Sequence, residues 1–230
     1  MKKIAIIPAR GGSKRIPRKN IKPFLGKPII AYSIQTAIES NLYDEVMVST
    51  DDKEIAQIAL NYEATVPFLR SLENANDYAT TADVITEVLD SYHKIDQEFD
   101  YCTCIYPTAP FVTSKLLQES LQKVISGKFD SVFPVLRYGF PIQRAMRATD
   151  SGKIVMIDSK NLKTRSQDLE PSFHDAGQFY TLSINAFKNS KALWTPNTGY
   201  IEISEIEAQD IDNEIDWKLA ELKYKLKFYE

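Results

Sequence analysis

Residues 4–20 read IAIIPARGGSKRIPRKN, and the change of pattern inside this stretch decides the fold. Ile4–Pro8 is a short apolar run rich in β-branched residues, which is typical of a buried strand. A basic loop with Gly11 and Gly12 follows it, and a helical apolar stripe begins at Pro28. A strand that opens through such a loop into a helix predicts the first unit of an α/β fold.

The same alternation continues along the chain. Further strands are expected at 45–49, 101–106 and 131–136, and further helices at 53–61, 84–92 and 114–126. Strands that alternate with helices predict right-handed crossovers and a mainly parallel, Rossmann-like sheet. Ligands of such sheets bind beyond the carboxyl ends of the strands, where the loops 9–27, 50–53 and 107–113 would meet.

The alternation of strand and helix patterns stops between residues 137 and 178, where glycines and prolines interrupt mostly polar segments. We therefore expect one domain over residues 1–230 with an arm inserted at about 137–178. Strand-like segments resume at 179–185 and 200–203. A closing helix from about residue 213 carries Ile215, Leu219, Leu222 and Leu226 on one face.

Composition excludes several classes of protein. The 230 residues are 43% hydrophobic, which is too apolar for a disordered chain, and no apolar run approaches the roughly 20 residues that span a bilayer. The start is neither an amphipathic transit peptide nor a secretory signal, because Pro8 and two glycines end a short apolar run. Cys102 and Cys104 lie too close along one strand to bridge easily, so a reducing, cytoplasmic setting is expected.

The net charge of −3 conceals two poles. Residues 1–38 contain nine Lys/Arg and no acid that could neutralise them, whereas residues 192–217 contain seven acids and no base. Such asymmetry is found in proteins that bind nucleic acid or a membrane surface, in targeting peptides, and in sites that handle phosphate and metal.

The basic loop has the chemistry of a phosphate site. Backbone N–H groups of a glycine-containing loop can cradle phosphate oxygens, and Arg10, Lys14 and Lys19 add charged donors. Neither the P-loop pattern nor the dinucleotide fingerprint is present. Arg15 and its neighbours Arg18 and Lys22 are assigned to solvent or secondary contacts.

The acidic pole contains a candidate metal pair. If residues 209–213 are extended, Asp210 and Asp212 project from one face about 6.6 Å apart, a spacing that suits a hard divalent cation. Acids ahead of a helix also favour its dipole. That reading is preferred for Glu214 and Asp216, and both readings stay open for Asp210 and Asp212.

Several motifs together resemble the CMP-sialate synthetase family, the cytidylyltransferases of nine-carbon keto-sugar acids. They are PARGGSKRIPRKN at 8–20, STDD at 49–52, YPTAPF at 106–111 and DIDNEIDW at 210–217, and they cover the chain in the family's order. The segment 164–180, TRSQDLEPSFHDAGQFY, looks most like the pseudaminic acid branch. Arg15, Tyr106 and the pair His174-Asp175 depart from the usual sialate pattern, which argues against plain N-acetylneuraminate.

The resemblance implies a three-layer α/β/α nucleotidyltransferase-type fold with an inserted dimerisation arm. It further implies a homodimer, Mg²⁺ as cofactor, CTP and a keto-sugar acid as substrates, and neither nucleic acid nor membrane as partner. Carried over position by position, it assigns Arg10, Lys14 and Lys19 to the CTP phosphates, with Ser13 and Asn20 in the same loop, and Asp210 and Asp212 to the metal. It places Arg70, Tyr106, Pro107 and Thr108 at the nucleotide or sugar, and Arg165, Gln178 and Tyr180 on the sugar side. Arg10, Lys19 and Asp212 are the expected catalytic residues.

Other functions compete with this interpretation. The nearest are the synthetases of CMP-N-acetylneuraminate, CMP-legionaminate and CMP-3-deoxy-manno-octulosonate. A non-catalytic nucleotide- or nucleic-acid-binding protein is a rival of a different class, because it would also explain the basic N-terminal segment.

Overall fold

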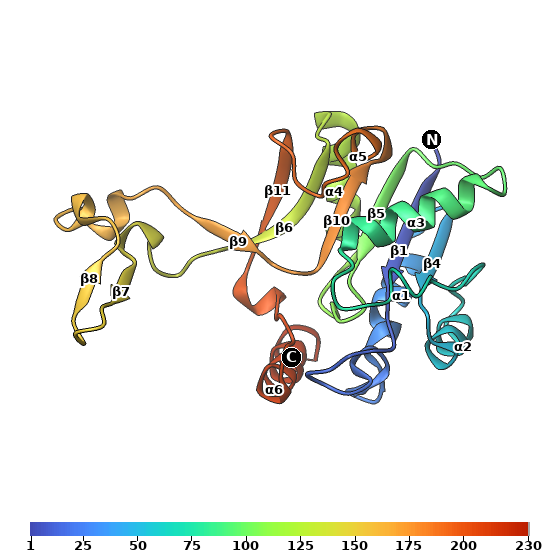
Figure 1. Ribbon diagram of the computed structural model, residues 1–230, viewed down its shortest axis with the longest axis horizontal. Coiled ribbons are helices and arrows are strands. Elements are labelled where there is room, and N and C mark those ends of the chain that lie inside the picture. Colours follow the sequence, from blue (N-terminus) through green and yellow to red (C-terminus); the bar gives the residue numbers. More distant parts are fainter. Residues whose placement is uncertain (230) are drawn as a thin grey trace.

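The computed structural model describes residues 1–229 and contains a seven-stranded sheet with helices on both faces (Figure 1). The strands lie in the order β11-β6-β10-β5-β1-β4, and β9 also pairs with β6. Their bounds are β1 Lys3–Pro8, β4 Glu45–Ser49, β5 Tyr101–Ile105, β6 Ser131–Arg137, β9 Phe173–Asp175, β10 Phe179–Ser183 and β11 Thr198–Ile203. The helices are α1 Ile29–Glu39, α2 Lys53–Asn61, α3 Thr81–His93, α4 Ser114–Gly127, α5 Ile184–Ser190 and α6 Glu214–Phe228. The expected α/β fold is confirmed.

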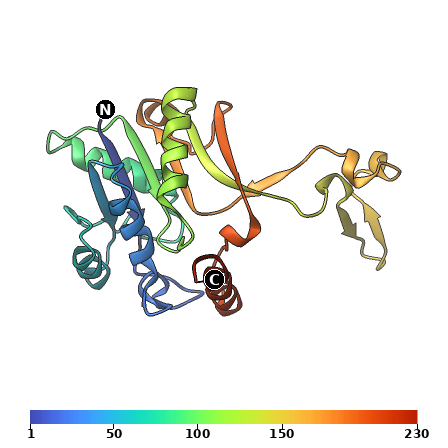
Figure 2. The ribbon, with the colours of Figure 1, turned by 180° about the vertical axis from the view of Figure 1, so that it is seen from behind.

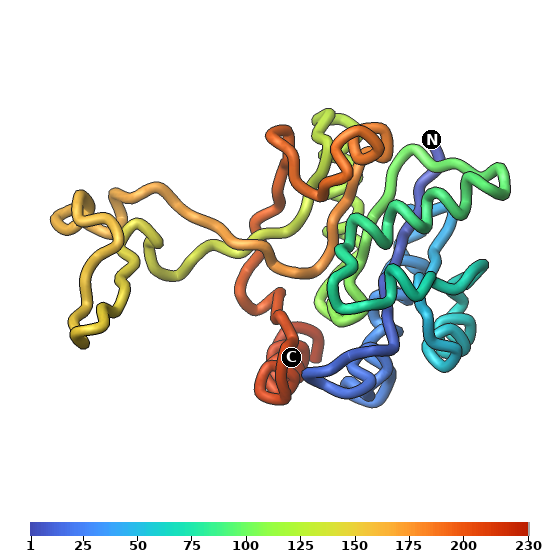
Figure 3. The backbone as a smooth tube through the Cα atoms, viewed as in Figure 1, coloured from blue at the N-terminus to red at the C-terminus, as the bar shows by residue number. Residues whose placement is uncertain are grey.

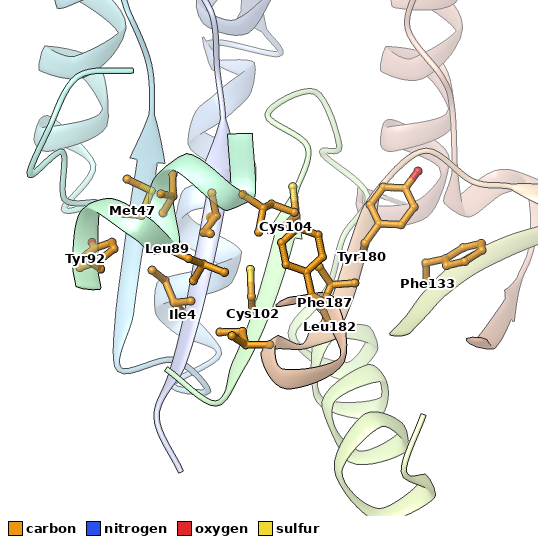
Figure 4. Close-up of a cluster of buried hydrophobic side chains, with 14 of the residues drawn as sticks. Ile4, Met47, Leu89, Tyr92, Cys102, Cys104, Phe133, Tyr180, Leu182 and Phe187 are labelled. Atoms are coloured by element: carbon orange, nitrogen blue, oxygen red, sulfur yellow. The ribbon is translucent and has the colours of Figure 1, made fainter. Parts of the chain in front are cut away.

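The three layers follow from the alternation of side chains along the buried strands. In β1, Ile4 and Ile6 face a core that includes residues of α3 and α5, part of which Figure 4 shows in close-up. Ala5 and Ile7 face the opposite core, which α1, α2 and α4 cover. Seen from behind, α4 crosses in front of the sheet (Figure 2). Because both faces of β1 are covered, its continuous apolar run is explained.

The sheet is mixed rather than parallel throughout. β1 pairs in parallel with β4 and β5, and β11 pairs in parallel with β6. β10, however, runs antiparallel to both β5 and β6, and β9 runs antiparallel to β6. The chain re-enters the sheet from the arm rather than through a crossover helix, and antiparallel pairing needs no such crossover.

An arm between β6 and β9 projects away from the sheet (Figure 3). It carries a hairpin of β7 (Met146–Ala148) and β8 (Ile154–Met156). The short 3-10 helices η2 Ile142–Arg144, η3 Ser159–Asn161 and η4 Ser166–Asp168 complete it. Several of its apolar side chains are open to solvent, among them Phe140 at 87% exposure.

The last helix, α6, packs beside the basic loop at one end of the sheet. Trp217 and Ala220 of α6 are buried with Ile16 and with Phe24 of the short strand β2 (Pro23–Phe24), which pairs with β3 (Lys27–Pro28). The acidic segment before α6 is thereby brought next to the basic loop. Among residues 1–229, no helix combines the length and the apolar character that a membrane span requires.

Candidate active site

The basic loop and the segment after β5 enclose a cleft of about 210 Å³ at the carboxyl ends of the central strands. It is lined by Pro8, Arg10, Ser13, Lys14, Arg15, Ile16, Lys19, Asn20, Tyr106, Pro107 and Thr108. Eight of the residues predicted from the sequence therefore share one cleft, and they come from two loops that lie far apart along the chain.

The loop is held in shape by contacts that leave its charged ends at the cleft. Asn20 is buried, and its Nδ2 donates to the Arg10 carbonyl at 2.9 Å, which ties the two ends of the loop together. The Gly11 amide donates to Asp51 Oδ1 at 2.9 Å. A Cβ on Gly11 would lie 2.8 Å from an Asp52 carboxylate oxygen, so glycine is required there by close approach.

Acids from distant segments neutralise the bases that line the cleft. Arg10 Nη1 lies 2.8 Å from Asp77 Oδ1, and Lys14 pairs with the other oxygen of Asp77. Arg15 Nη1 lies 2.6 Å from Asp212 Oδ2. The first 38 residues lack acids, but the fold supplies them from elsewhere, so the expectation of an unneutralised basic segment is wrong.

A second set of pairs fixes the outer side of the loop, away from the cleft. Arg18 contacts Asp52 and Glu54, and Lys22 Nζ lies 2.6 Å from Glu214. The Arg18 guanidinium, helped by backbone amides of α2, lowers the pKa of Asp52 to about 2. Neither Arg18 nor Lys22 lines the cleft, and their assignment to solvent or secondary contacts stays a prediction.

The two aspartates proposed as metal ligands lie at the cleft edge beside Lys19. Lys19 Nζ donates to the Ile211 carbonyl at 2.7 Å and lies 4.0 Å from Asp212 Oδ1. Burial lowers the pKa of Lys19, and the Asp212 charge opposes that effect. Although the Asp210 side chain is open to solvent, partial desolvation and the nearby Asp212 raise its pKa.

This pair of carboxylates fits a hard cation. Two close acids, one of them without an ion-pair partner among the described contacts, favour a divalent ion that relieves their repulsion. Within residues 1–229 there is no group of three or more Asp, Glu, His or Cys side chains that could hold a metal. The remaining ligands of an ion at Asp210 and Asp212 must therefore come from substrate oxygens and water.

Aromatic side chains extend the site on the other side of Tyr106. The Tyr106 and Tyr180 rings meet edge to face at 5.6 Å, and the Tyr106 amide donates to the Gln178 carbonyl at 2.8 Å. The Tyr180 hydroxyl points away from the apolar cluster (Figure 4) and donates to Asp175. Gln178 Oε1 is buried and has no partner among the described residues.

Six predicted residues do not line the cleft; besides Asp210, Asp212, Gln178 and Tyr180, these are Arg70 and Arg165. Arg70 is only 7% exposed, and its Nε and Nη2 donate to the hydroxyl and carbonyl of Ser49 at 3.0 and 2.5 Å. Arg165 precedes η4 on the arm that projects in Figure 1. Its Nε donates to Asp168 at 2.7 Å. The arm carries Arg165 away from the cleft of its own chain.

Sequence reasoning missed two residues of the cleft's charge network. Arg15 lines the cleft, although it was assigned to solvent or secondary contacts. Asp77 lies in an irregular loop between Arg70 and α3, where no motif distinguishes it from its neighbours.

A larger groove of about 580 Å³ beside α3 is a poorer candidate for an anionic substrate. Four carboxylates line it, those of Glu73, Asp83, Glu87 and Asp90, against only two lysines. Phosphate would be repelled there, so the smaller cleft is the better candidate.

Comparisons with known proteins relate the chain to cytidylyltransferases. The sequence model of the cytidylyltransferase family matches residues 4–198. The chain is 39% identical to a pseudaminic acid cytidylyltransferase from Campylobacter jejuni over 98% of this chain and 97% of the relative. It is 33% identical to a CMP-N,N'-diacetyllegionaminic acid synthase from Legionella pneumophila over 96% and 95% of the two chains.

A solved structure supports the fold independently of close sequence similarity. It is a CMP:2-keto-3-deoxy-manno-octonic acid synthetase complexed with CTP, with a TM-score of 0.72 at 17% identity. The match covers 99% of this chain and 100% of the other.

Proposed function

The chain belongs to the cytidylyltransferase family, a family of nucleotidyltransferases, and from this premise we propose that it activates pseudaminic acid with CTP. The products are the CMP-sugar and pyrophosphate. The observation that carries the proposal is the cleft, which Arg10, Lys14 and Lys19 line together with Tyr106–Thr108. The 39% identity to a pseudaminic acid cytidylyltransferase over nearly the whole chain supports the choice of sugar.

The proposed reaction needs no covalent enzyme intermediate. The anomeric hydroxyl oxygen of the keto-sugar acid forms a bond to the α-phosphorus of CTP, the bond to the bridging oxygen of the β-phosphate breaks, and the hydroxyl proton is released to solvent. Catalysis then consists of positioning and of neutralising charge. Arg10 and Lys19 stabilise the negative charge that develops on the leaving pyrophosphate. Ser13 and Lys14 hold the same phosphates, and Asn20 keeps the loop closed on Arg10.

We further propose that Asp210 and Asp212 hold Mg²⁺. When bound, the ion supplies Lewis-acid polarisation of the phosphate oxygens. Asp212 is paired with Arg15 in this structure, and Arg15 lines the cleft wall. A cation held by Asp212 would compete with this ion pair, which would leave the Arg15 guanidinium available to the triphosphate.

Replacement of one carboxylate tests the metal site. We expect Asp212→Asn to raise the Mg²⁺ concentration for half-maximal activity on the order of tenfold or more, because an amide is a weaker ligand for a hard cation. Direct Mn²⁺ binding, measured by electron paramagnetic resonance, should weaken in parallel. Glu205→Gln is the control, since this substitution removes one charge from the same acidic stretch. The Glu205 side chain has no described partner, so no contact is lost with it. An unchanged metal titration would make Asp210 and Asp212 structural residues.

A panel of sugar acids tests the reaction and the substrate together. Purified protein is supplied with CTP, Mg²⁺ and either pseudaminic acid, legionaminic acid, N-acetylneuraminic acid or 3-deoxy-manno-octulosonic acid, and pyrophosphate release is followed. We expect the highest kcat/KM with pseudaminic acid. A higher value with another acid would correct the substrate, and CTP binding without pyrophosphate release from any acid would overturn the catalytic proposal.

We also propose a homodimer in which the arm of one subunit reaches the cleft of the other. The exposed apolar side chains of the arm support it, because they gain by burial against a second copy. If Arg165 supplies a cation to the sugar carboxylate, as the family resemblance implies, it would do so from the partner's arm, because the arm projects away from the body of its own chain. Two buried free cysteines, Cys102 and Cys104, fit a reducing cytoplasmic compartment, where we place the enzyme.

A further inference from the structure

We propose that Asp77 is a positioning residue of the reaction, which orients Arg10 and Lys14 from behind the cleft so that their free donors meet the phosphates of CTP. The inference deepens the proposed function and rests on it. Asp77 belongs to the irregular loop that leads from Arg70 to α3, and no residue of this loop has another assigned part in the chemistry.

Asp77 uses both carboxylate oxygens on the two bases. Its Oδ1 accepts from Arg10 Nη1 at 2.8 Å, and its Oδ2 contacts Lys14 Nζ. Arg10 Nη1 also donates to the Asn76 carbonyl at 2.9 Å. These two bonds use both hydrogens of Nη1, whereas none of the hydrogen bonds described for residues 1–229 uses Nε or Nη2 of Arg10. Three of the five guanidinium N–H groups remain for a ligand.

The geometry favours orientation rather than competition. Arg10 and Lys14 line the cleft, but Asn76 and Asp77 do not. A phosphate in the cleft and the carboxylate behind it can therefore contact the same two bases at once. A guanidinium on a flexible stem is thus held in one orientation before the ligand arrives, which is what preorganised charge stabilisation requires.

The loop that carries Asp77 is built as a fixed support. Asn76 Oδ1 accepts from the Tyr78 and Ala79 amides at 2.7 and 3.0 Å, so the turn around Asp77 is closed on itself. Glu87 of α3 accepts from the Ser71 amide at 2.7 Å and anchors the start of the loop. The capping box of Thr80 with Asp83 joins its end to α3. Asp77 is in this way fixed to the body of the domain.

A second explanation of the contacts between Asp77 and the two bases predicts the opposite change in phosphate affinity when Asp77 is neutralised. If Asp77 were a stand-in anion that CTP must displace, neutralising it would tighten binding of phosphates, because a competitor would be lost. If Asp77 orients the bases, neutralising it weakens binding and slows the reaction. The sign of one measurement separates the two.

The experiment compares wild-type protein, Asp77→Asn and Glu73→Gln. Glu73 lies in the same loop, and its side chain has no described partner. Glu73→Gln therefore removes one negative charge from the loop, as Asp77→Asn does, but breaks no described contact. Inorganic pyrophosphate binding by calorimetry is the first readout, since it needs neither the sugar acid nor turnover. We expect Asp77→Asn to weaken it on the order of tenfold, with Glu73→Gln close to wild type. Equal or tighter binding by Asp77→Asn would overturn the proposal.

Turnover provides the second readout. We expect kcat of Asp77→Asn to fall between about tenfold and 10²-fold, with little change in KM for the sugar acid, because the lost orientation affects charge on the leaving group. In an Arg10→Ala background the same substitution should cost less, since one of the two bases through which Asp77 acts is gone. Full additivity would refute an action through Arg10. Wild-type turnover on the sugar panel decides the proposed function separately, and the pyrophosphate result stands whatever that panel shows.

Discussion

At the scale of single residues, Asp52 combines a helix cap with a counter-ion. Its Oδ1 accepts from the Glu54 and Ile55 amides at 2.9 and 3.0 Å, which caps α2. The same carboxylate also accepts a hydrogen bond from Arg18 of the basic loop, with 2.5 Å between Arg18 Nη1 and Asp52 Oδ2. The pKa of Asp52 is lowered to about 2 as a result, mainly by Arg18.

The lowered pKa predicts a pH dependence of stability. A carboxyl whose folded pKa lies below its unfolded value stabilises the fold above the unfolded pKa, and this contribution is lost as the pH falls from about 4 towards 2. We expect Asp52→Asn to lower the free energy of unfolding at pH 7 by about 1 kcal/mol, because solvent screens part of the ion pair. The difference from wild type should shrink below about pH 4 in urea titrations at several pH values.

Asp52→Ala separates the two roles of the side chain. Asparagine still caps a helix, whereas alanine does not, so Ala should cost about 1 kcal/mol more than Asn at every pH. A gap between wild type and Asp52→Asn that stayed constant from pH 7 to pH 2 would contradict the lowered pKa of Asp52.

Residue identities in the cleft could be predicted only where a local motif marks them. Arg10, Lys14 and Lys19 lie in one basic loop directly after a strand, so their charge and position indicated a phosphate site, and the family resemblance then assigned them to the CTP phosphates. Asp77 could not be found in this way, because its partner Arg10 lies 67 positions away and only the fold joins them.

At the scale of elements, the type of most helices and strands could be predicted, but some orientations could not. The predicted strand 45–49 and helix 53–61 agree with β4 and α2. The direction of β10 depends on how the arm returns to the sheet, and no pattern within residues 179–183 encodes it. The helix α5 was not predicted, because seven residues are too short for a helical period to stand out.

The last helix shows why a periodic pattern does not reveal which face is buried. Leu219 and Leu222 have the helical spacing that predicted α6, yet they are 42% and 59% exposed. Trp217 and Ala220, on another face, are buried instead. Both faces of α6 are apolar, and the large indole of Trp217, which packs edge to face on Phe24 at 5.7 Å, buries more area than a leucine could.

At the scale of the whole molecule, the two charged poles of the sequence meet at one end of the sheet. The basic loop follows β1, and the acidic segment reaches it because α6 packs on Ile16 and Phe24. The arm is the one large feature that leaves this body (Figure 2). The proposed dimer would use this projecting segment, with its exposed apolar side chains and Arg165, and the contribution of the arm to a site can be tested by mixing subunits.

Subunit complementation is the test, with one defect in the arm and the other in the cleft. We expect Arg165→Ala and Asp212→Asn to be nearly inactive as homodimers, the first for lack of a cation near the sugar carboxylate and the second for lack of a metal ligand. A mixed dimer then contains one site with an intact cleft and an intact arm from its partner. Random reassortment of equal amounts should restore about a quarter of wild-type activity, because half of the dimers are mixed and each has one working site.

The outcome distinguishes three arrangements of the arm. If Arg165 served the cleft of its own chain, both sites of a mixed dimer would stay defective and no activity would return. If Arg165 took no part in the reaction, Arg165→Ala alone would keep wild-type turnover. Lys153→Ala, on the exposed β7–β8 hairpin of the same arm, is the control for loss of a positive charge there. Recovery on mixing, with that control active, requires a site built from two chains, because no single chain in the mixture carries both intact residues.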